Sequence, residues 1–182
     1  FNDRKLETGV AITRAPTVTE LITHTSGLRS DYAKYGRIWF QDWTRNQSLA
    51  YVVAEVAKDF SFVTEPGTSY AYSGIGTDVA ARVSEVVSGE PRNQMLQTWV
   101  CEPLGMAHTF YRDAGGLKRQ KTEMPTRYFI GKETGKLRVT TRRRIPNTNG
   151  YSSSGGTIIS TAPDLLNWLL LLRNNGTHAG KQ

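Results

Sequence analysis

A tyrosine just ahead of a predicted helix is the residue of this chain whose position best suits proton transfer. Tyr72 follows the turn-forming pair Pro66-Gly67, and apolar residues then recur at spacings of three and four as far as Val87, which predicts an amphipathic helix. A phenol at a helix entrance is held by a rigid element and can still face a cleft. It transfers protons when neighbouring cations stabilise its phenolate. The alternative that this stretch leaves open is an ordinary half-buried tyrosine packed at a helix start.

A loop dense in hydrogen-bond donors and acceptors, His24-Thr25-Ser26-Gly27, is the second candidate for chemistry. His24 and Ser26 suggest a base and a nucleophile. Two residues apart on one loop is a poor geometry for that pair, and no acidic residue is marked out to orient the imidazole ring. We therefore expect this loop to be a hydrogen-bonded scaffold.

Four segments in order along the chain resemble one known family. They are residues 17–28, 65–74, 102–109 and 155–168. In this order they resemble the serine β-lactamase-related family, which includes class C β-lactamases, D-Ala-D-Ala carboxypeptidases and related esterases. The resemblance implies a serine hydrolase that works through an acyl-enzyme on an ester, amide or β-lactam bond. It implies a small-molecule or peptidoglycan-like substrate, no cofactor, and a periplasmic or secreted location.

The resemblance also implies roles for individual residues. Tyr72 matches the tyrosine of the family's Tyr-x-Asn motif and is the expected catalytic acid/base, with Ser73 and Gly74 as substrate-binding residues. The loop from His24 to Gly27 is expected to support the active site. Gly74 stands where the motif has asparagine, whose amide binds the substrate's side-chain carbonyl and the lysine in β-lactamases. This departure disfavours efficient β-lactam hydrolysis and favours an esterase-like or peptidase-like member, or one with weakened catalysis.

The family's nucleophile motif is missing from these 182 residues. No serine has a lysine three positions later, as the family's Ser-x-x-Lys requires. Two near matches to its later strand motif, 132–135 and 178–180, have the wrong length or the wrong place. We therefore expect the chain to be the central part of a longer protein, inactive alone, with the nucleophile and the N- and C-terminal sheet portions outside it.

Positive charge is concentrated in one segment. The chain carries +7 overall, and residues 112–144 hold eleven Lys or Arg against three acidic residues. Such a segment suits nucleic acid, an anionic polymer or a membrane surface, or it is a solvated insertion. Nucleic acid is not the favoured partner, and the missing parts of the same fold are expected partners. Two alternatives to the hydrolase stay open: a catalytically weakened member acting as a binding or sensing module, and a basic anion-binding module.

Other residue types exclude some functions. The scattered three histidines and one cysteine give no metal-ligand spacing, so no metal site is expected. Cys101 lies in an apolar run and is expected to be a buried, inert thiol. The longest apolar run, Leu165 to Leu172, is far too short to span a bilayer. It is apolar nearly all round, so its helix is either deeply buried or packs on something absent.

These patterns predict a mostly helical α+β fold, the central part of a β-lactamase/penicillin-binding-protein-like α/β fold with a small β-hairpin. Helices are expected near 18–23, 48–58, 75–88, 91–100 and 162–174, a short strand at 109–112, and a hairpin from 127–130 and 137–140. An aromatic-rich stretch, 30–44, either packs or overhangs a cleft. We expect one fragment of a single domain, 1–182. Its parts are a helical region at 17–110, a basic hairpin insertion at 111–150, and a loop with a final buried helix at 151–182.

Overall fold

The computed structural model describes residues 4–28, 48–58, 61–112, 128–139 and 153–178. Its helices are α1 (Val18–Ile22), α3 (Leu49–Lys58), α4 (Gly74–Ser88), α5 (Arg92–Met95), the π-helix η3 (Leu96–Cys101), α6 (Glu102–Leu104) and α8 (Ala162–Arg173). Its strands are β1 (Phe110–Tyr111), β2 (Tyr128–Ile130), β3 (Leu137–Val139) and β4 (Ile158–Ile159). The aromatic-rich stretch at 30–44 and the arginines at 142–144 lie outside the described residues.

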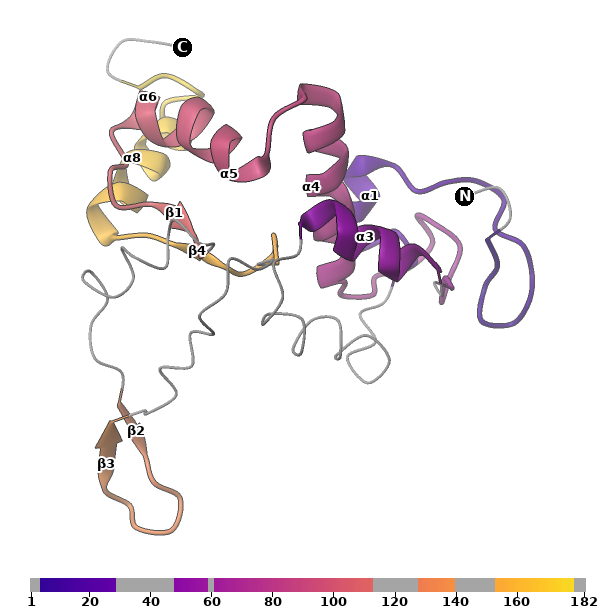
Figure 1. Ribbon diagram of the computed structural model, residues 1–182, viewed down its shortest axis with the longest axis horizontal. Helices are drawn as coiled ribbons and strands as arrows, with labels where there is room; N and C mark the ends of the chain where they lie inside the picture. Colours follow the sequence, from indigo (N-terminus) through magenta and orange to yellow (C-terminus); the bar gives the residue numbers. More distant parts are fainter. Residues whose placement is uncertain (1–3, 29–47, 59–60, 113–127, 140–152, 179–182) are drawn as a thin grey trace.

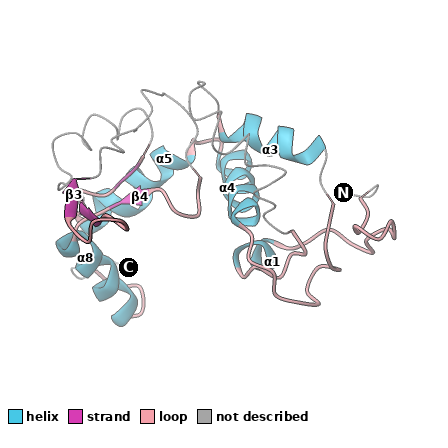
Figure 2. Ribbon diagram, turned by 90° about the horizontal axis from the view of Figure 1, so that it is seen from below, coloured by secondary structure: helices cyan, strands magenta, loops and turns pink. Residues whose placement is uncertain are grey.

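The elements form two groups of helices and a separate hairpin. One group holds α1, α3 and α4, and the other holds α5, α6 and α8 with β1 and β4 (Figures 1 and 2). Strands β1 and β4 pair antiparallel, as do β2 and β3. The α+β prediction with minor sheets is confirmed. Strand β4 was not predicted, because two isoleucines after a glycine pair give no alternating pattern.

Helix ends follow the sequence signals closely. Thr17 and Glu20 form a capping box at α1, as their spacing requires. Ser48 caps α3 by accepting the amide hydrogen bond of Tyr51. At the C-terminal end of α4, Gly89 adopts the left-handed conformation with φ of 74°. These caps fix where α1, α3 and α4 start or stop.

The helical segment after Pro91 differs from the single helix predicted for 91–100. It changes from α5 to the π-helix η3 and continues through α6 to Leu104. A π turn accommodates an extra residue, which shifts the buried face of the helix. Cys101 is buried as expected, Met95 is buried too, and Trp99 is 59% exposed.

The core consists of separate apolar clusters. One joins α3 to α4 through Leu49, Val52, Val56 and Ile75. A second gathers Ile12, Leu21, Leu28, Phe62 and Ala80 beneath α1 and α4. A third, around Cys101, Leu104 and Met106, also contacts Leu171 of α8. The first two clusters hold the N-terminal end of α4, where Tyr72 lies.

The described part of the chain does not bury the final helix, which agrees with the second of the two alternatives, that it packs on something absent from this chain. Its exposed leucines, each between 49% and 57% exposed, are Leu165, Leu166, Leu169 and Leu172. Its buried residue is Asp164. Of its apolar residues, Leu171 contacts the Cys101 cluster. None of the helices in the described ranges has the length and hydropathy needed to cross a membrane.

Candidate functional site

Tyr72 lies in the extended segment directly before α4, next to the helix N-cap Ser73. Its side chain is 51% exposed. The ring packs on the imidazole of His24, with centroids 4.6 Å apart and planes tilted by 43°. Tyr70 meets the same imidazole edge-on at 5.9 Å. One histidine therefore positions two exposed tyrosines at the entrance of α4.

His24 is hydrogen-bonded to the extended segment that carries Tyr72. Its carbonyl oxygen accepts a hydrogen bond of 2.8 Å from the Ala71 amide, and its Nδ1 accepts one of 3.2 Å from the Ser73 amide. Acceptance at Nδ1 places the proton of a neutral ring on Nε2. His24 also has a positive φ of 60°, which is uncommon for a residue other than glycine. These contacts make the imidazole a support for the Tyr72 segment.

The rest of this loop forms further backbone contacts with the same stretch. The Thr25 carbonyl accepts from the Gly67 amide at 2.8 Å, and the Gly27 carbonyl accepts from the Val63 amide at 2.9 Å. Ser26 is buried, and its Oγ accepts a hydrogen bond from the Leu28 amide. These backbone hydrogen bonds hold the loop at 24–27 alongside residues 63–73.

Gly27 is required by this close approach. Its φ is +77°, and a Cβ built on it would lie 2.1 Å from the carbonyl oxygen of Thr64. No side chain fits at that distance, so the loop and the 63–65 segment can approach only at a glycine.

Ser73 and Gly74, the two predicted substrate-binding residues, are both buried at the first turn of α4. The Ser73 hydroxyl accepts a 2.9 Å hydrogen bond from the Gly76 amide, which caps the helix. The Gly74 carbonyl accepts from Thr77 Oγ1 at 2.7 Å. Substrate binding by this pair stays a prediction, and Tyr72 is the exposed member of the three.

A buried carboxylate that the sequence analysis missed lies one turn further along α4. Asp78 is 2% exposed, and its Oδ1 accepts a 2.6 Å hydrogen bond from the Ser154 amide. The Arg92 guanidinium lies 3.9 Å from the same oxygen and also donates to Ser154 Oγ. In the sequence, the feature that points to this contact is an aspartate within an amphipathic helix. The carboxylate ties α4 to α5 and to the loop before β4.

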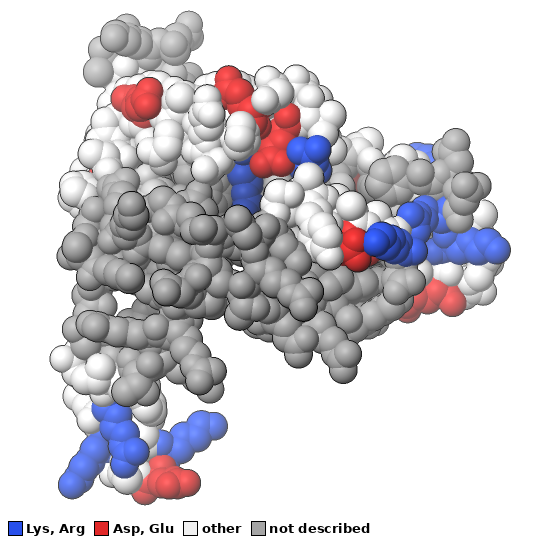
Figure 3. Space-filling view, viewed as in Figure 1, with Lys and Arg blue, Asp and Glu red and all other residues white. Residues whose placement is uncertain are grey.

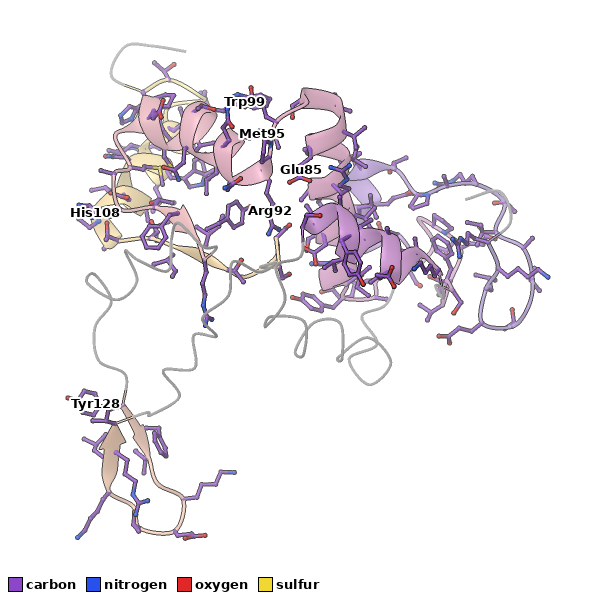
Figure 4. The ribbon with its side chains drawn as sticks, in the orientation of Figure 1. Glu85, Arg92, Met95, Trp99, His108 and Tyr128 are labelled. Atoms are coloured by element: carbon purple, nitrogen blue, oxygen red, sulfur yellow. The ribbon has the colours of Figure 1, made fainter. Side chains whose placement is uncertain are left out.

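The arginine of this junction also contacts α4 and β1. The Arg92 amide donates to Glu85 Oε1 at 3.1 Å, and Figure 4 shows the two residues where α4 and α5 meet. The guanidinium lies 4.8 Å from the ring centroid of Tyr111. Burial raises the pKa of the Tyr111 hydroxyl, and the nearby Arg92 charge partly opposes that rise. Tyr111 therefore packs as a neutral phenol.

A second buried carboxylate fastens α8. Asp164 Oδ2 accepts hydrogen bonds of 2.8 Å from the His108 amide and from Thr109 Oγ1. Thr109 Oγ1 also lies 2.7 Å from Ser160 Oγ.

Across the described ranges, no group of three or more His, Cys, Asp or Glu side chains is arranged to hold a metal ion. Cys101 is a buried free thiol, as predicted. The chemistry that this arrangement offers is an exposed phenol on a rigid helix entrance. Its support comes from the loop at 24–27.

Comparison with known proteins finds a matching family model and several relatives. The model of the beta-lactamase family matches residues 7–182. The D-alanyl-D-alanine-carboxypeptidase/endopeptidase AmpH of Escherichia coli is 28% identical over 156 residues, which cover 84% of this chain and 35% of AmpH. The unguisins hydrolase ungD of Aspergillus violaceofuscus is 24% identical over 162 residues, covering 87% of this chain and 27% of ungD.

Solved structures share the fold. The octameric penicillin-binding protein homologue from Pyrococcus abyssi superposes with a TM-score of 0.65 at 24% identity, over 97% of this chain and 40% of that one. EstCE1, a hydrolase with promiscuous acyltransferase activity, superposes with a TM-score of 0.70 at 23% identity, over 98% of this chain and 50% of that one. The chain thus spans about a third of the length of the curated relatives it matches.

Proposed function

Because this chain belongs to the beta-lactamase family, we propose that it is the central portion of a serine hydrolase that uses Tyr72 as its acid/base. The reaction is acyl transfer from an ester, amide or β-lactam bond to a serine and then to water. The serine and its partner lysine lie in a part of the protein beyond these 182 residues. Two facts support this: no serine here has a lysine three residues on, and the relatives are much longer.

The observation that carries the proposal is the exposed phenol of Tyr72 at the entrance of α4. The Tyr72 ring packs on His24 and is half exposed, and among the tyrosines on His24 it is the one that directly precedes the N-cap of α4. The neighbouring Ser73 and Gly74 are committed to the helix start. Tyr72 is thus held in place, with its polar end accessible to a substrate.

The mechanism follows from where protons must move. A lysine ammonium beside the phenol would stabilise its phenolate, which takes the serine's proton directly or through the lysine during acylation. The phenol passes this proton to the departing alcohol or amine, and the regenerated phenolate then activates the water that hydrolyses the acyl-enzyme. The relatives include a D-alanyl-D-alanine carboxypeptidase, which supports a peptidoglycan-like or other small acyl substrate. A periplasmic or secreted location is part of the proposal and rests on resemblance alone.

The test is Tyr72→Phe in the full-length protein, assayed on a chromogenic short-chain ester. The substitution keeps the ring on His24 and removes the hydroxyl. We expect turnover to fall by about 10²–10⁴-fold, the usual contribution of a positioned acid–base group, with little change in melting temperature.

Tyr70→Phe is the matched control, because Tyr70 also packs on His24 and is 69% exposed. It should leave turnover nearly unchanged. Equal losses for both variants, or turnover of Tyr72→Phe within about twofold of the parent, would contradict the proposed role of Tyr72.

Gly74 favours a second candidate function, a family member with weakened catalysis that binds or senses its ligand. A glycine there gives a substrate only backbone groups. This candidate predicts that the full-length protein becomes acylated by a labelled β-lactam and keeps the label. The hydrolase predicts instead that the full-length protein turns over the chromogenic short-chain ester, which the weakened member does not.

A further inference from the structure

The hairpin of β2 and β3 has one face made only of apolar side chains. In its register, Tyr128 lies opposite Val139 and Ile130 lies opposite Leu137. Residues two apart on a strand, and residues directly opposite across a pair, share one face of a sheet. All four side chains are between 50% and 72% exposed. The hairpin lies apart from both helix groups (Figure 1).

Basic residues lie on the opposite face, beside Phe129, and in the turn of the hairpin. Phe129 pairs with Arg138 on the second face. The turn carries Lys132 and Lys136 against one acid, Glu133, so residues 128–139 have a net charge of +2. Figure 3 shows these cationic side chains spread around the end of the hairpin. The turn is well defined, because the amides of Thr134 and Gly135 both donate to the Gly131 carbonyl.

A two-stranded hairpin with a bare apolar face is marginally stable in water and needs a surface to cover it. A second copy of this chain would bring another basic hairpin against the first, so like charges oppose that pairing. A soluble polyanion would satisfy the lysines and leave the apolar face in water. An anionic bilayer satisfies both, since acyl chains accept the apolar face and lipid phosphates accept the cations.

We propose that the β2–β3 hairpin is a peripheral membrane-docking element for anionic lipid bilayers. The hairpin lies flat, with Tyr128, Ile130, Leu137 and Val139 turned into the headgroup–acyl boundary. The tyrosine hydroxyl stays at headgroup level, as interfacial tyrosines do. Lys132 and Lys136 in the turn meet lipid phosphates at the rim, and Arg138, on the opposite face, adds its charge within a Debye length of the surface. This role is independent of Tyr72 and of catalysis.

Co-sedimentation with vesicles tests the proposal on the 182-residue chain and on the full-length protein. Vesicles of equal parts phosphatidylglycerol and phosphatidylcholine should bind the chain, and pure phosphatidylcholine should bind it much more weakly. Ile130→Ser combined with Leu137→Ser should lower the affinity for the anionic vesicles by about tenfold or more, because two buried side chains are lost.

A second variant tests the charges and does not disturb the apolar face. Lys132→Gln, Lys136→Gln and Arg138→Gln together should weaken binding by about a hundredfold, from about fivefold for each cation near an anionic surface. Raising the salt concentration should reduce binding of the parent and change binding of this variant little.

The matched control is Val86→Ser with Val87→Ser on α4, since both valines are exposed, at 65% and 81%, and lie far from the hairpin in sequence. It should bind vesicles like the parent. Three outcomes would overturn the proposal. The first is that Ile130→Ser with Leu137→Ser binds anionic vesicles as well as the parent does. The second is that heparin binds through the three cations alone and competes fully with the vesicles. The third is that the chain forms a dimer without lipid and that Ile130→Ser with Leu137→Ser abolishes this dimer.

Discussion

Glu20 links several segments around α1 through its carboxylate. Arg14 donates to it twice, at 2.6 and 2.8 Å, and the Thr17 amide donates at 2.8 Å. The same guanidinium donates to the Pro66 carbonyl, in the turn that leads toward Tyr72. The Arg14 hydrogen bonds, followed by that of Thr17, lower the pKa of Glu20 from 4.5 to about 2.

This lowered pKa predicts an acid-sensitive contribution to stability. Because folding lowers the pKa, the contribution is complete above pH 4.5 and is lost as the pH falls toward about 2. Glu20→Gln removes it, so the melting temperatures of parent and variant should differ most near neutral pH and converge below about pH 2. Melting curves across that range measure the difference. A constant difference at every pH would show that Glu20 acts through packing alone.

At the scale of elements, α8 is attached by two polar side chains of unequal strength. Asp164 accepts hydrogen bonds from His108 and Thr109 and is 5% exposed. Asn167, less than one turn later, donates one hydrogen bond of 2.9 Å to the Leu104 carbonyl. We expect Asp164→Ala to cost about 3 kcal/mol, because it strands buried donors, and Asn167→Ala about 1 kcal/mol.

Chemical denaturation of the parent and both variants measures the loss in free energy of unfolding for each substitution. Asn167→Ala serves as the control for loss of a neutral hydrogen bond on the same helix. Equal costs would mean that the carboxylate contributes no more than any single hydrogen bond.

Elements with local signals were predictable from the sequence, and contacts between distant segments were not. The capping box at Thr17, the cap at Ser48 and the stop at Gly89 depend on neighbouring residues, so those helices were placed within one or two residues. The partners of Asp78 and Asp164 are 76 and 56 residues away. No periodicity predicts them. The π-helix was missed because its extra residue is a tertiary adjustment.

The site was predictable in part for the same reason. The position of Tyr72 before a helix follows from local pattern, and the helix start at Gly74 agrees with it. The packing of His24 on Tyr72 joins residues of two distant segments, and only the structure reveals it. The catalytic roles themselves remain proposals.

At the scale of the whole molecule, the exposed leucines of α8 predict self-association of the 182-residue chain. Exposed apolar surface of this kind favours association, and membrane docking by the β2–β3 hairpin would not bury the α8 leucines. Sedimentation velocity should show a larger species that grows with concentration. Leu166→Lys with Leu169→Lys should restore the monomer, and Ile130→Ser with Leu137→Ser should not. A parent chain that stays monomeric and melts cooperatively would argue against an incomplete core.

Two hydrogen bonds that join residues far apart in the sequence imply an order of folding during synthesis. The Ser73 amide meets His24 across 49 residues, whereas Asp78 meets the Ser154 amide across 76. Because a chain leaves the ribosome from its N-terminus, the Tyr72 entrance can close while the loop that covers Asp78 is still untranslated. A nascent chain paused between these points would hold its tyrosine in place with the Asp78 carboxylate still hydrated. Translation speed over the intervening codons would then decide how long that half-built state lasts.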